Sequence, residues 1–179
     1  MELNEALLSR RSIRDFEPNV VLKQETIEVL LTAAQMAPSW KNSQTGRYYI
    51  ALKPECRQAV LQNCLPEMNQ KRAENASALI VTAFEKGISG FDLNGSPVNE
   101  IGNGWGAYDL GLQNQNLLLK ARELGLDSLV MGIRDADALR KLFFIPESQE
   151  IVSVIALGIR RVDPDIPRRK ELLEIAAFF

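Results

Sequence analysis

The chain of 179 residues contains no histidine and only two cysteines, Cys56 and Cys64. Histidine is a common ligand of catalytic zinc and the usual general base beside a serine or cysteine nucleophile. The two cysteines lack the C-x-x-C spacing of redox and metal motifs, which favours two reduced structural thiols. The sequence therefore excludes the common histidine-dependent enzymes, and we expect no metal site.

Long apolar runs and an excess of positive charge are also missing. No run of about eighteen apolar residues occurs, and the N-terminal stretch "MELNEALL" is acidic where a signal peptide would be basic. The formal net charge of −2 offers no general attraction for nucleic acid. The length suits one domain, and 46% hydrophobic residues can form a core. We expect one cytoplasmic domain over residues 1–179, without a membrane segment or a nucleic-acid partner.

Arginine is concentrated in two short windows, although the chain as a whole is slightly acidic. The windows contain Arg10, Arg11 and Arg14 around Ser12, and then Arg160, Arg161, Arg168 and Arg169. A guanidinium fork grips a compact anion bidentately, and a serine hydroxyl adds another donor. The N-terminal window is therefore typical either of a phosphate site or of a solvated surface cluster.

Hydrophobic periodicity predicts helices and strands that alternate along most of the chain. Helices are expected over 1–10, 22–38, 53–65, about 66–77, 107–125 and 135–144. Strands are expected over 46–52, 78–84, 128–132 and 150–159. The last strand is apolar nearly throughout, which predicts a central position in the sheet.

Two segments fit neither pattern. Residues 86–106 are rich in Gly, Asn and Ser and form either a mobile loop or a lid over a site. The stretch "GNGWG" within them lacks the spacing of a dinucleotide fingerprint. The tail "DPDIPRRKELLEIAAFF" exposes much apolar surface unless a partner subunit covers it or it folds back on its own core.

Four motifs occur in order: "RRSIRDF", "APSWKNSQ" at 37–44, "MNQKRAENAS" at 68–77 and "DLGLQNQNLLLKARELGLDS" at 109–128. With these motifs and its basic tail, the chain resembles the nitroreductase family of flavin enzymes over nearly its whole length. The resemblance implies an α+β fold, a mixed central β-sheet flanked by helices, in an intertwined homodimer. FMN would lie at each subunit interface, and a C-terminal arm of about residues 163–179 would reach the partner subunit.

The resemblance also implies which residues contact the cofactor. Within one chain they are Arg10, Arg11, Ser12, Arg14, Asn69, Arg72, Met131, Gly132 and, from the tail, Arg168, Arg169 and Lys170. The partner chain would add Pro38, Ser39, Trp40, Asn42 and Gln44. Arg10 and Ser12 match phosphate contacts, whereas Arg14 and Arg72 match cations at the flavin ring, where they favour hydride acceptance. The register of the tail stays open, with Arg169 and Lys170 favoured, and Arg160 and Arg161 are expected to be solvated.

The implied activity is hydride transfer from NAD(P)H through FMN to nitroaromatic, quinone or similar acceptors, in ping-pong turnover. The flavin then carries the chemistry, so the missing histidine is no obstacle. Trp40, Phe91 and Trp105 are candidates to line the substrate pocket, although Trp40 stands where the family often has a small residue. The alternatives are a flavin-binding or flavin-handling protein without reductase turnover, and a regulatory domain that binds another phospholigand.

Overall fold

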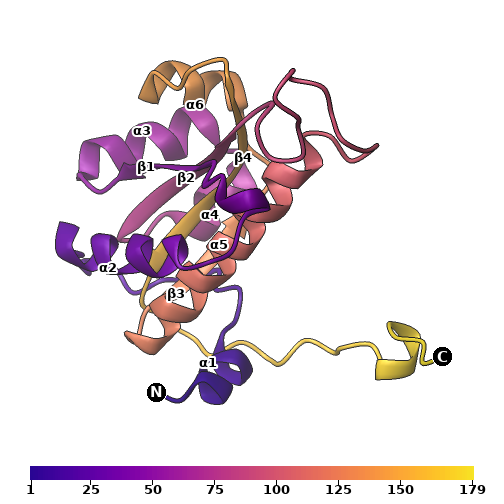
Figure 1. Cartoon of the computed structure of the whole chain (residues 1–179). Coiled ribbons are helices and arrows are strands. Elements are labelled where there is room, and N and C mark those ends of the chain that lie inside the picture. Colours follow the sequence, from indigo (N-terminus) through magenta and orange to yellow (C-terminus); the bar gives the residue numbers. More distant parts are fainter.

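The middle layer of the molecule is a four-stranded sheet with the order β1-β2-β4-β3. The computed structural model describes residues 1–179 (Figure 1). The strands are β1 (Gly46–Ala51), β2 (Ala78–Glu85), β3 (Asp127–Met131) and β4 (Gln149–Gly158). All three strand pairs are antiparallel. The one parallel pairing is the bridge between Ser12 and Ser128, so only the N-terminal segment makes the sheet mixed.

Helices cover both faces of the sheet, as expected for the α+β class. Helices α2 (Gln24–Gln35) and α5 (Gly104–Glu123) pack on one face, and α3 (Pro54–Cys64), α4 (Glu67–Ala73) and α6 (Ala136–Phe143) pack on the other (Figure 1). Side chains of β2 alternate between the two cores: Leu79 and Val81 enter the core under α3, whereas Ala78 and Ile80 enter the core under α2. This period of two explains why β2 is buried almost throughout.

Helix α5 begins earlier than the composition of the 86–106 segment indicates. Its first residue is Gly104, so "GNGWG" starts a helix. A Cβ on Gly106 would collide with the ring of Phe84, and this close packing outweighs the poor helix propensity of glycine. The preceding turns are held by Asp92 Oδ1, which accepts from the backbone N–H groups of Asn94 and Ser96.

The first and last parts of the chain lie side by side. After α1 (Leu3–Ser9), residues 12–17 pair with β3 through Ser128, and Phe16 bridges to Arg160 just beyond β4. Ile13 and Phe16 are both 1% exposed, so this segment is anchored in the core. The pairing brings the N-terminal arginines next to the beginning of the C-terminal tail.

Arg160 is an ion-pair residue, and the expectation that it is solvated was wrong. Its Nε donates to Asp127 Oδ2 at 2.9 Å and its Nη2 to Asp127 Oδ1 at 2.5 Å. Asp127 is 3% exposed at the start of β3, so its carboxylate requires such a partner. Arg160 also donates to the Ser9 carbonyl and to Asp163. The bonds to Asp127 and then to Asp163 raise the pKa of the Arg160 guanidinium. Arg161 is exposed, as expected.

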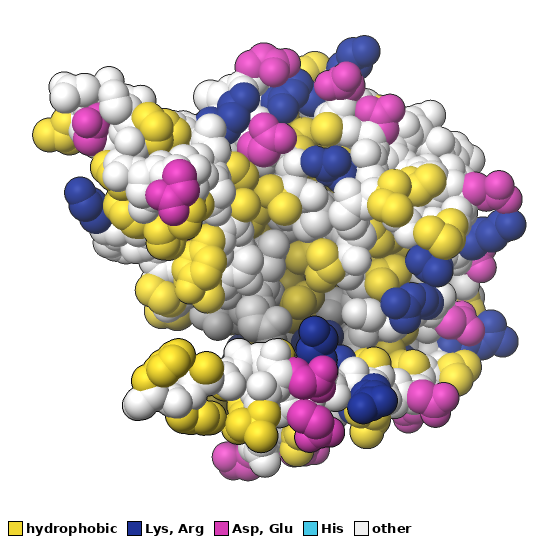
Figure 2. Space-filling model, turned by 90° about the vertical axis from the view of Figure 1, so that its right-hand side faces the viewer, with side chains coloured by type: hydrophobic (Ala, Val, Ile, Leu, Met, Phe, Trp, Pro, Cys, Tyr) yellow, Lys and Arg dark blue, Asp and Glu magenta, His cyan; other side chains and the backbone are white.

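From Asp163 the chain extends away from the body as an arm, residues 163–179. The arm contains the short helix η2 (Leu172–Glu174) near its end (Figure 1). The arm does not fold back on its own core. Its apolar side chains are exposed, with Leu173 at 81% and Phe178 at 78%. Figure 2 shows the arm from its tip, with apolar side chains on it and a hollow in the body above it. No helix of the chain is both long and apolar enough to cross a membrane.

Candidate functional site

Arginines from both ends of the chain line one small cavity. Its volume is about 220 Å³, and it is lined by Arg10, Arg11, Ser12, Arg14, Pro164, Asp165, Pro167 and Arg169. No apolar side chain other than the two prolines contributes to it. Asp165 is the one carboxylate among four guanidinium groups, so the cavity carries a net positive charge.

The local fold explains why these side chains point outward together. Arg10 follows the last residue of α1, and its N–H closes the helix by donating to the Ala6 carbonyl. Ile13 and Phe16 are buried, whereas Ser12 and Arg14, on either side of Ile13, are exposed. The Ile13 N–H donates to the Ser128 carbonyl at 2.9 Å, which fixes the segment on the edge strand β3.

The guanidinium groups that line the cavity repel one another. Burial lowers the pKa of the Arg10 guanidinium, and repulsion from Arg169 and then Arg11 lowers it further. Arginines are brought this close when an anion neutralises them, because each guanidinium can then donate charge-assisted hydrogen bonds. The donor set fits a phosphate group.

The structure distinguishes among the three basic residues of the tail. All three side chains are exposed, but only Arg169 lines the cavity. Arg161 also lies outside the cavity. Of the two tail residues favoured from the sequence, the cavity therefore includes only Arg169.

A second group of expected residues lies near the end of β3. Asn69, on α4, is 5% exposed, and its Nδ2 donates to the Ile133 carbonyl at 2.9 Å. This bond ties α4 to the segment that follows β3. The side chain of Met131 is buried in the core, so only its backbone is available to a ligand, while Gly132 is exposed and Arg72 is half-buried. From Ser128 to Ile133 an extended chain covers about 16 Å.

The third group, in the 38–44 loop, has strained backbone geometry. Lys41, Asn42 and Gln44 have φ values of 48°, 57° and 50°. Left-handed conformations of residues other than glycine cost of order 1–3 kcal/mol each and persist where the surroundings enforce them. Here the Trp40 N–H donates to Asp109 Oδ2 at 2.9 Å, and the Gln44 N–H donates to Ser39 Oγ at 3.1 Å.

Aromatic rings form a cluster beside this loop. The ring centroids of Trp40 and Trp105 are 4.8 Å apart, and those of Trp105 and Tyr108 are 5.6 Å apart. Gly90, at φ 81°, leaves room for the Trp105 indole, which a Cβ there would hit. The Trp40 indole N–H is buried and has no acceptor within the chain. The backbone of Phe91, also expected at the pocket, forms a β-bridge with Pro97.

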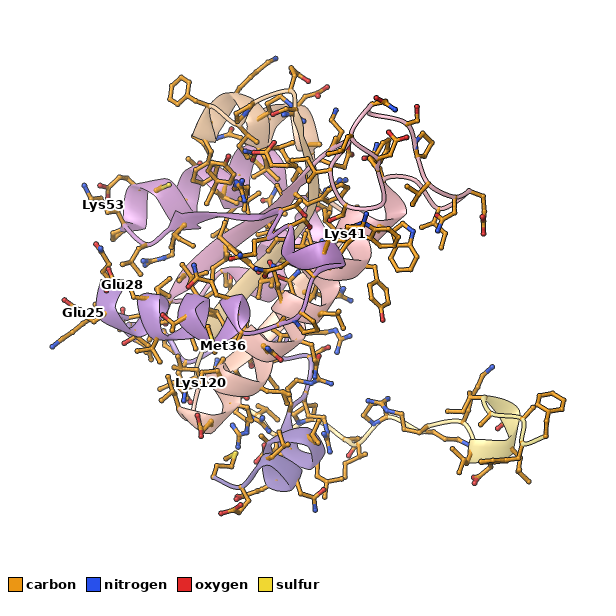
Figure 3. All side chains as sticks on the ribbon, viewed as in Figure 1. Glu25, Glu28, Met36, Lys41, Lys53 and Lys120 are labelled. Atoms are coloured by element: carbon orange, nitrogen blue, oxygen red, sulfur yellow. The ribbon has the colours of Figure 1, made fainter.

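Helix α5 separates the arginine cavity from the 38–44 loop. Asp109 contacts the loop near the N-terminal end of α5, and Arg122 donates to Ser9 Oγ near the other end. Thirteen residues of helix between them span about 20 Å. Figure 3 shows this separation: Lys41, in the loop, and Lys120 lie at opposite ends of α5.

Sequence reasoning missed Asp109, Ser89 and Tyr108. A signal for Asp109 existed, because Gly106, Asp109, Leu110 and Gln113 have the spacing of one buried helix stripe. A carboxylate on such a stripe needs a partner. The partners, however, lie in distant loops that the stripe does not identify.

The two cysteines are not part of this site. Burial raises the pKa of the Cys56 thiol and, with the charge of Asp135 as a second cause, raises that of Cys64 to about 11. Both thiols are free and stay protonated at neutral pH, so neither is an activated nucleophile.

Comparisons with known proteins agree with this fold. A model of the nitroreductase family matches residues 7–159. DrgA of Synechocystis sp. is 28% identical over 94% of this chain and 89% of its own length. An Archaeoglobus fulgidus protein, provisionally named NADH dehydrogenase/NAD(P)H nitroreductase, is 30% identical over 89% of this chain and 86% of its own. A protein of Exiguobacterium sibiricum, crystallised with FMN, has a TM-score of 0.87 at 21% identity, over 100% of this chain and 98% of its own.

The layered sheet and the matched segment define an α+β oxidoreductase. The chain belongs to the nitroreductase family. The resemblance stated from the four sequence motifs is thereby confirmed.

Proposed function

We propose that the protein is an FMN-dependent NAD(P)H oxidoreductase, built as one domain over residues 1–179 and active as a homodimer. The observation that carries this proposal is the convergence of Arg10, Arg11, Arg14 and Arg169 on one cavity. The E. sibiricum protein with the same fold was crystallised in complex with FMN, whose phosphate is an anion of suitable size. When bound, FMN supplies hydride-transfer chemistry that the side chains cannot.

In this proposal the FMN phosphate is held in the arginine cavity and the ring lies along the edge of β3. The Ser12 hydroxyl and the four guanidinium groups donate to the phosphate. Asn69, Arg72 and the backbone of Met131 and Gly132 lie at the ring end. The cations Arg14 and Arg72 favour electron uptake because negative charge beside them is stabilised. Arg168 and Lys170 act only as nearby charges.

A second copy of the chain is needed to complete the pocket. About 20 Å of α5 separates the cavity from the 38–44 loop of the same chain, which favours a loop supplied by the partner subunit. That loop would bring Pro38, Ser39, Trp40, Asn42 and Gln44 to the ring. The aromatic rings of Trp40 and Trp105 would form the wall that faces a planar substrate, with Phe91 further away.

Exposed apolar surface supports the homodimer. A groove of about 310 Å³ is bounded by α1, α2 and α5, and Leu3, Met36 and Leu119 are among the side chains that line it. The arm, residues 163–179, presents an apolar end with no cover in its own chain. Burying one such side chain contributes about 1.5–3 kcal/mol. We propose that the arm packs on the partner subunit.

The hydride donor is inferred from a relative, and the acceptor from the shape of the proposed pocket. The provisional name of the A. fulgidus relative supports NADH or NADPH as donor. A single open face at the ring would serve donor and acceptor in turn, which is ping-pong turnover. We propose nitroaromatics, quinones or similar planar compounds as acceptors. The cytoplasmic location expected from the sequence stays a prediction.

The test is spectroscopic. Purified protein mixed with FMN should bind it in about one equivalent per chain, lose its flavin absorbance on addition of NADH or NADPH, and regain it on addition of a quinone. Protein that holds FMN but is reduced by neither nicotinamide would indicate the flavin-handling alternative. Protein that binds no FMN would favour a different phospholigand.

A further inference from the structure

Asp109 is a buried carboxylate without a counter-ion. It is 2% exposed on α5, and it makes no ion pair in the structure. Burying a carboxylate is costly unless hydrogen bonds replace its water. The bonds that Asp109 accepts therefore indicate what the side chain is there to hold.

Both of those bonds converge on Oδ2. The Trp40 N–H donates to this oxygen at 2.9 Å, and the Ser89 hydroxyl donates to it at 2.7 Å. Bonds to a charged acceptor are roughly twice as strong as neutral ones. One atom of α5 thus fixes the beginning of the 38–44 loop and Ser89, which lies in the segment before α5.

Ser89 extends this contact to the other end of the loop. Its hydroxyl oxygen lies 2.8 Å from Ser43 Oγ and 3.4 Å from Thr45 Oγ1. Ser89 and Thr45 are both buried. The network therefore holds the loop on both sides of Lys41 and Asn42, the residues with left-handed backbone.

The same network orients the aromatic cluster. The Asp109 bond is to the backbone of Trp40, whose ring contacts Trp105. Tyr108 precedes Asp109 on α5, and its ring contacts Trp105 from another side. Trp105 Nε1 donates to Asn99 Oδ1 at 2.9 Å, which fixes the second indole independently of Asp109. Only Trp40 depends directly on the carboxylate.

We propose that Asp109 is a positioning residue that, through Trp40 and Ser89, holds the strained 38–44 loop and its indole in the orientation that receives a planar ligand. This inference rests on the proposed function, because that function sets the loop beside the flavin ring. In this proposal the buried Asp109 acts through Trp40 and Ser89 and does not contact the ligand. Its effect on turnover is therefore expected in the KM of the acceptor more than in kcat.

The structure offers a direct readout of the position of Trp40. The chain has two tryptophans, Trp40 and Trp105, and they are in contact. Indoles at this separation couple their electronic transitions, so the flavin-free protein should show an exciton couplet by circular dichroism near 225 nm, absent from Trp105→Phe. Because the chain has no third tryptophan, a loss of the couplet shows that the two indoles have changed their relative position.

The informative variants are Asp109→Ala and Asp109→Asn. Asp109→Ala should abolish most of the couplet, because the Trp40 N–H and the Ser89 hydroxyl lose their shared acceptor. Asp109→Asn should retain more of it, since an amide oxygen can accept the same two bonds without the charge. Ser89→Ala should reduce the couplet by an intermediate amount, and it tests the same network if Asp109→Ala does not fold. Asp92→Ala is the matched control, since exposed Asp92 also accepts two hydrogen bonds on one oxygen.

The kinetic arm uses the FMN-loaded enzyme. Asp109→Ala removes both bonds, and loss of the charge-assisted bond to the Trp40 N–H alone predicts a KM for a quinone at least about tenfold higher, with a smaller change in kcat. A couplet that survives in Asp109→Ala, or disappears equally in Asp92→Ala, would overturn the inference, as would an unchanged KM. If no variant nor the parent oxidises NAD(P)H but the couplet follows Asp109, the positioning role stands and the proposed function fails.

Discussion

At the scale of single residues, Arg169 is the decisive test of the phosphate cavity. Removing one charge-assisted bond costs about 1.5–3 kcal/mol, so Arg169→Ala should raise the Kd of FMN about 10- to 100-fold. Arg168→Ala and Lys170→Ala should raise it far less, because both side chains are outside the cavity. Flavin fluorescence titration measures all three constants.

Arg161→Ala is the control for general electrostatics, since Arg161 is exposed and outside the cavity. It should change the Kd far less than Arg169→Ala does, because salt screens an exposed charge that makes no direct contact with the anion. A larger effect of Lys170→Ala than of Arg169→Ala would show that the tail binds in another register.

Whether a site residue could be predicted from the sequence depends on how far away in the sequence its partners lie. The cluster around Ser12 could be predicted because its members are close in sequence and need only local backbone alternation. Arg160 could not, because its role depends on Asp127, which is 33 residues away in sequence and reaches it only through the pairing of β3 with β4. Asp109 was missed for the same reason, since Trp40 and Ser89 come to it from two loops.

At the scale of elements, helices and strands followed from periodicity because each has one or two buried faces. The start of α5 did not, since glycine-rich "GNGWG" becomes helical only through the close approach of Gly106 to Phe84. The left-handed residues of the 38–44 loop were equally hidden, because tertiary bonds from α5 enforce them. At the start of α5 and in the 38–44 loop, tertiary packing overrides the local conformational preference of the residues.

The pairing of β3 with both chain ends gives the prediction at this scale. Asp127 accepts from Arg160 and from Arg122 Nη1 at 3.2 Å, and Arg160 reaches Ser9, next to Arg10. Asp127→Ala removes the carboxylate that binds the partly buried Arg160 and Arg122 and leaves Arg160 only exposed Asp163 as a counter-ion, so the free energy of unfolding should fall by about 1.5–3 kcal/mol. Urea unfolding of the flavin-free protein measures this.

The ion pair should also matter for the cofactor. Because Arg160 ties Ser9 to Asp163, its release loosens both segments that carry the cavity arginines, and FMN affinity should fall in Asp127→Ala although Asp127 does not line the cavity. Glu67→Ala, which breaks the exposed Lys71 pair, is the control and should change stability by less than about 1 kcal/mol. Equal effects of the two variants would contradict the tertiary role of Asp127.

At the scale of the whole molecule, the arm is the part whose conformation a single chain does not explain. Its apolar end makes no core of its own, and the body carries an apolar groove beside α1 and α2. The two buried faces of the sheet strands could be predicted from one chain. The surface that covers the arm, however, belongs to the proposed second copy. Sequence pattern therefore identified an unsatisfied segment and not its partner.

Deleting residues 171–179 removes that apolar end and keeps Arg169. Burial of even two such side chains contributes about 3–6 kcal/mol, so the dimer dissociation constant should rise about a hundredfold or more. Sedimentation velocity over a concentration series measures it. Leu93→Asp, which changes a fully exposed leucine in the 86–103 segment, is the control and should leave the dimer intact. The partner's loop is proposed to close the flavin pocket, so dilution should release FMN from the truncated protein at concentrations where the full chain retains it. If the truncated protein dimerises as tightly as the full chain, the arm contributes nothing to assembly.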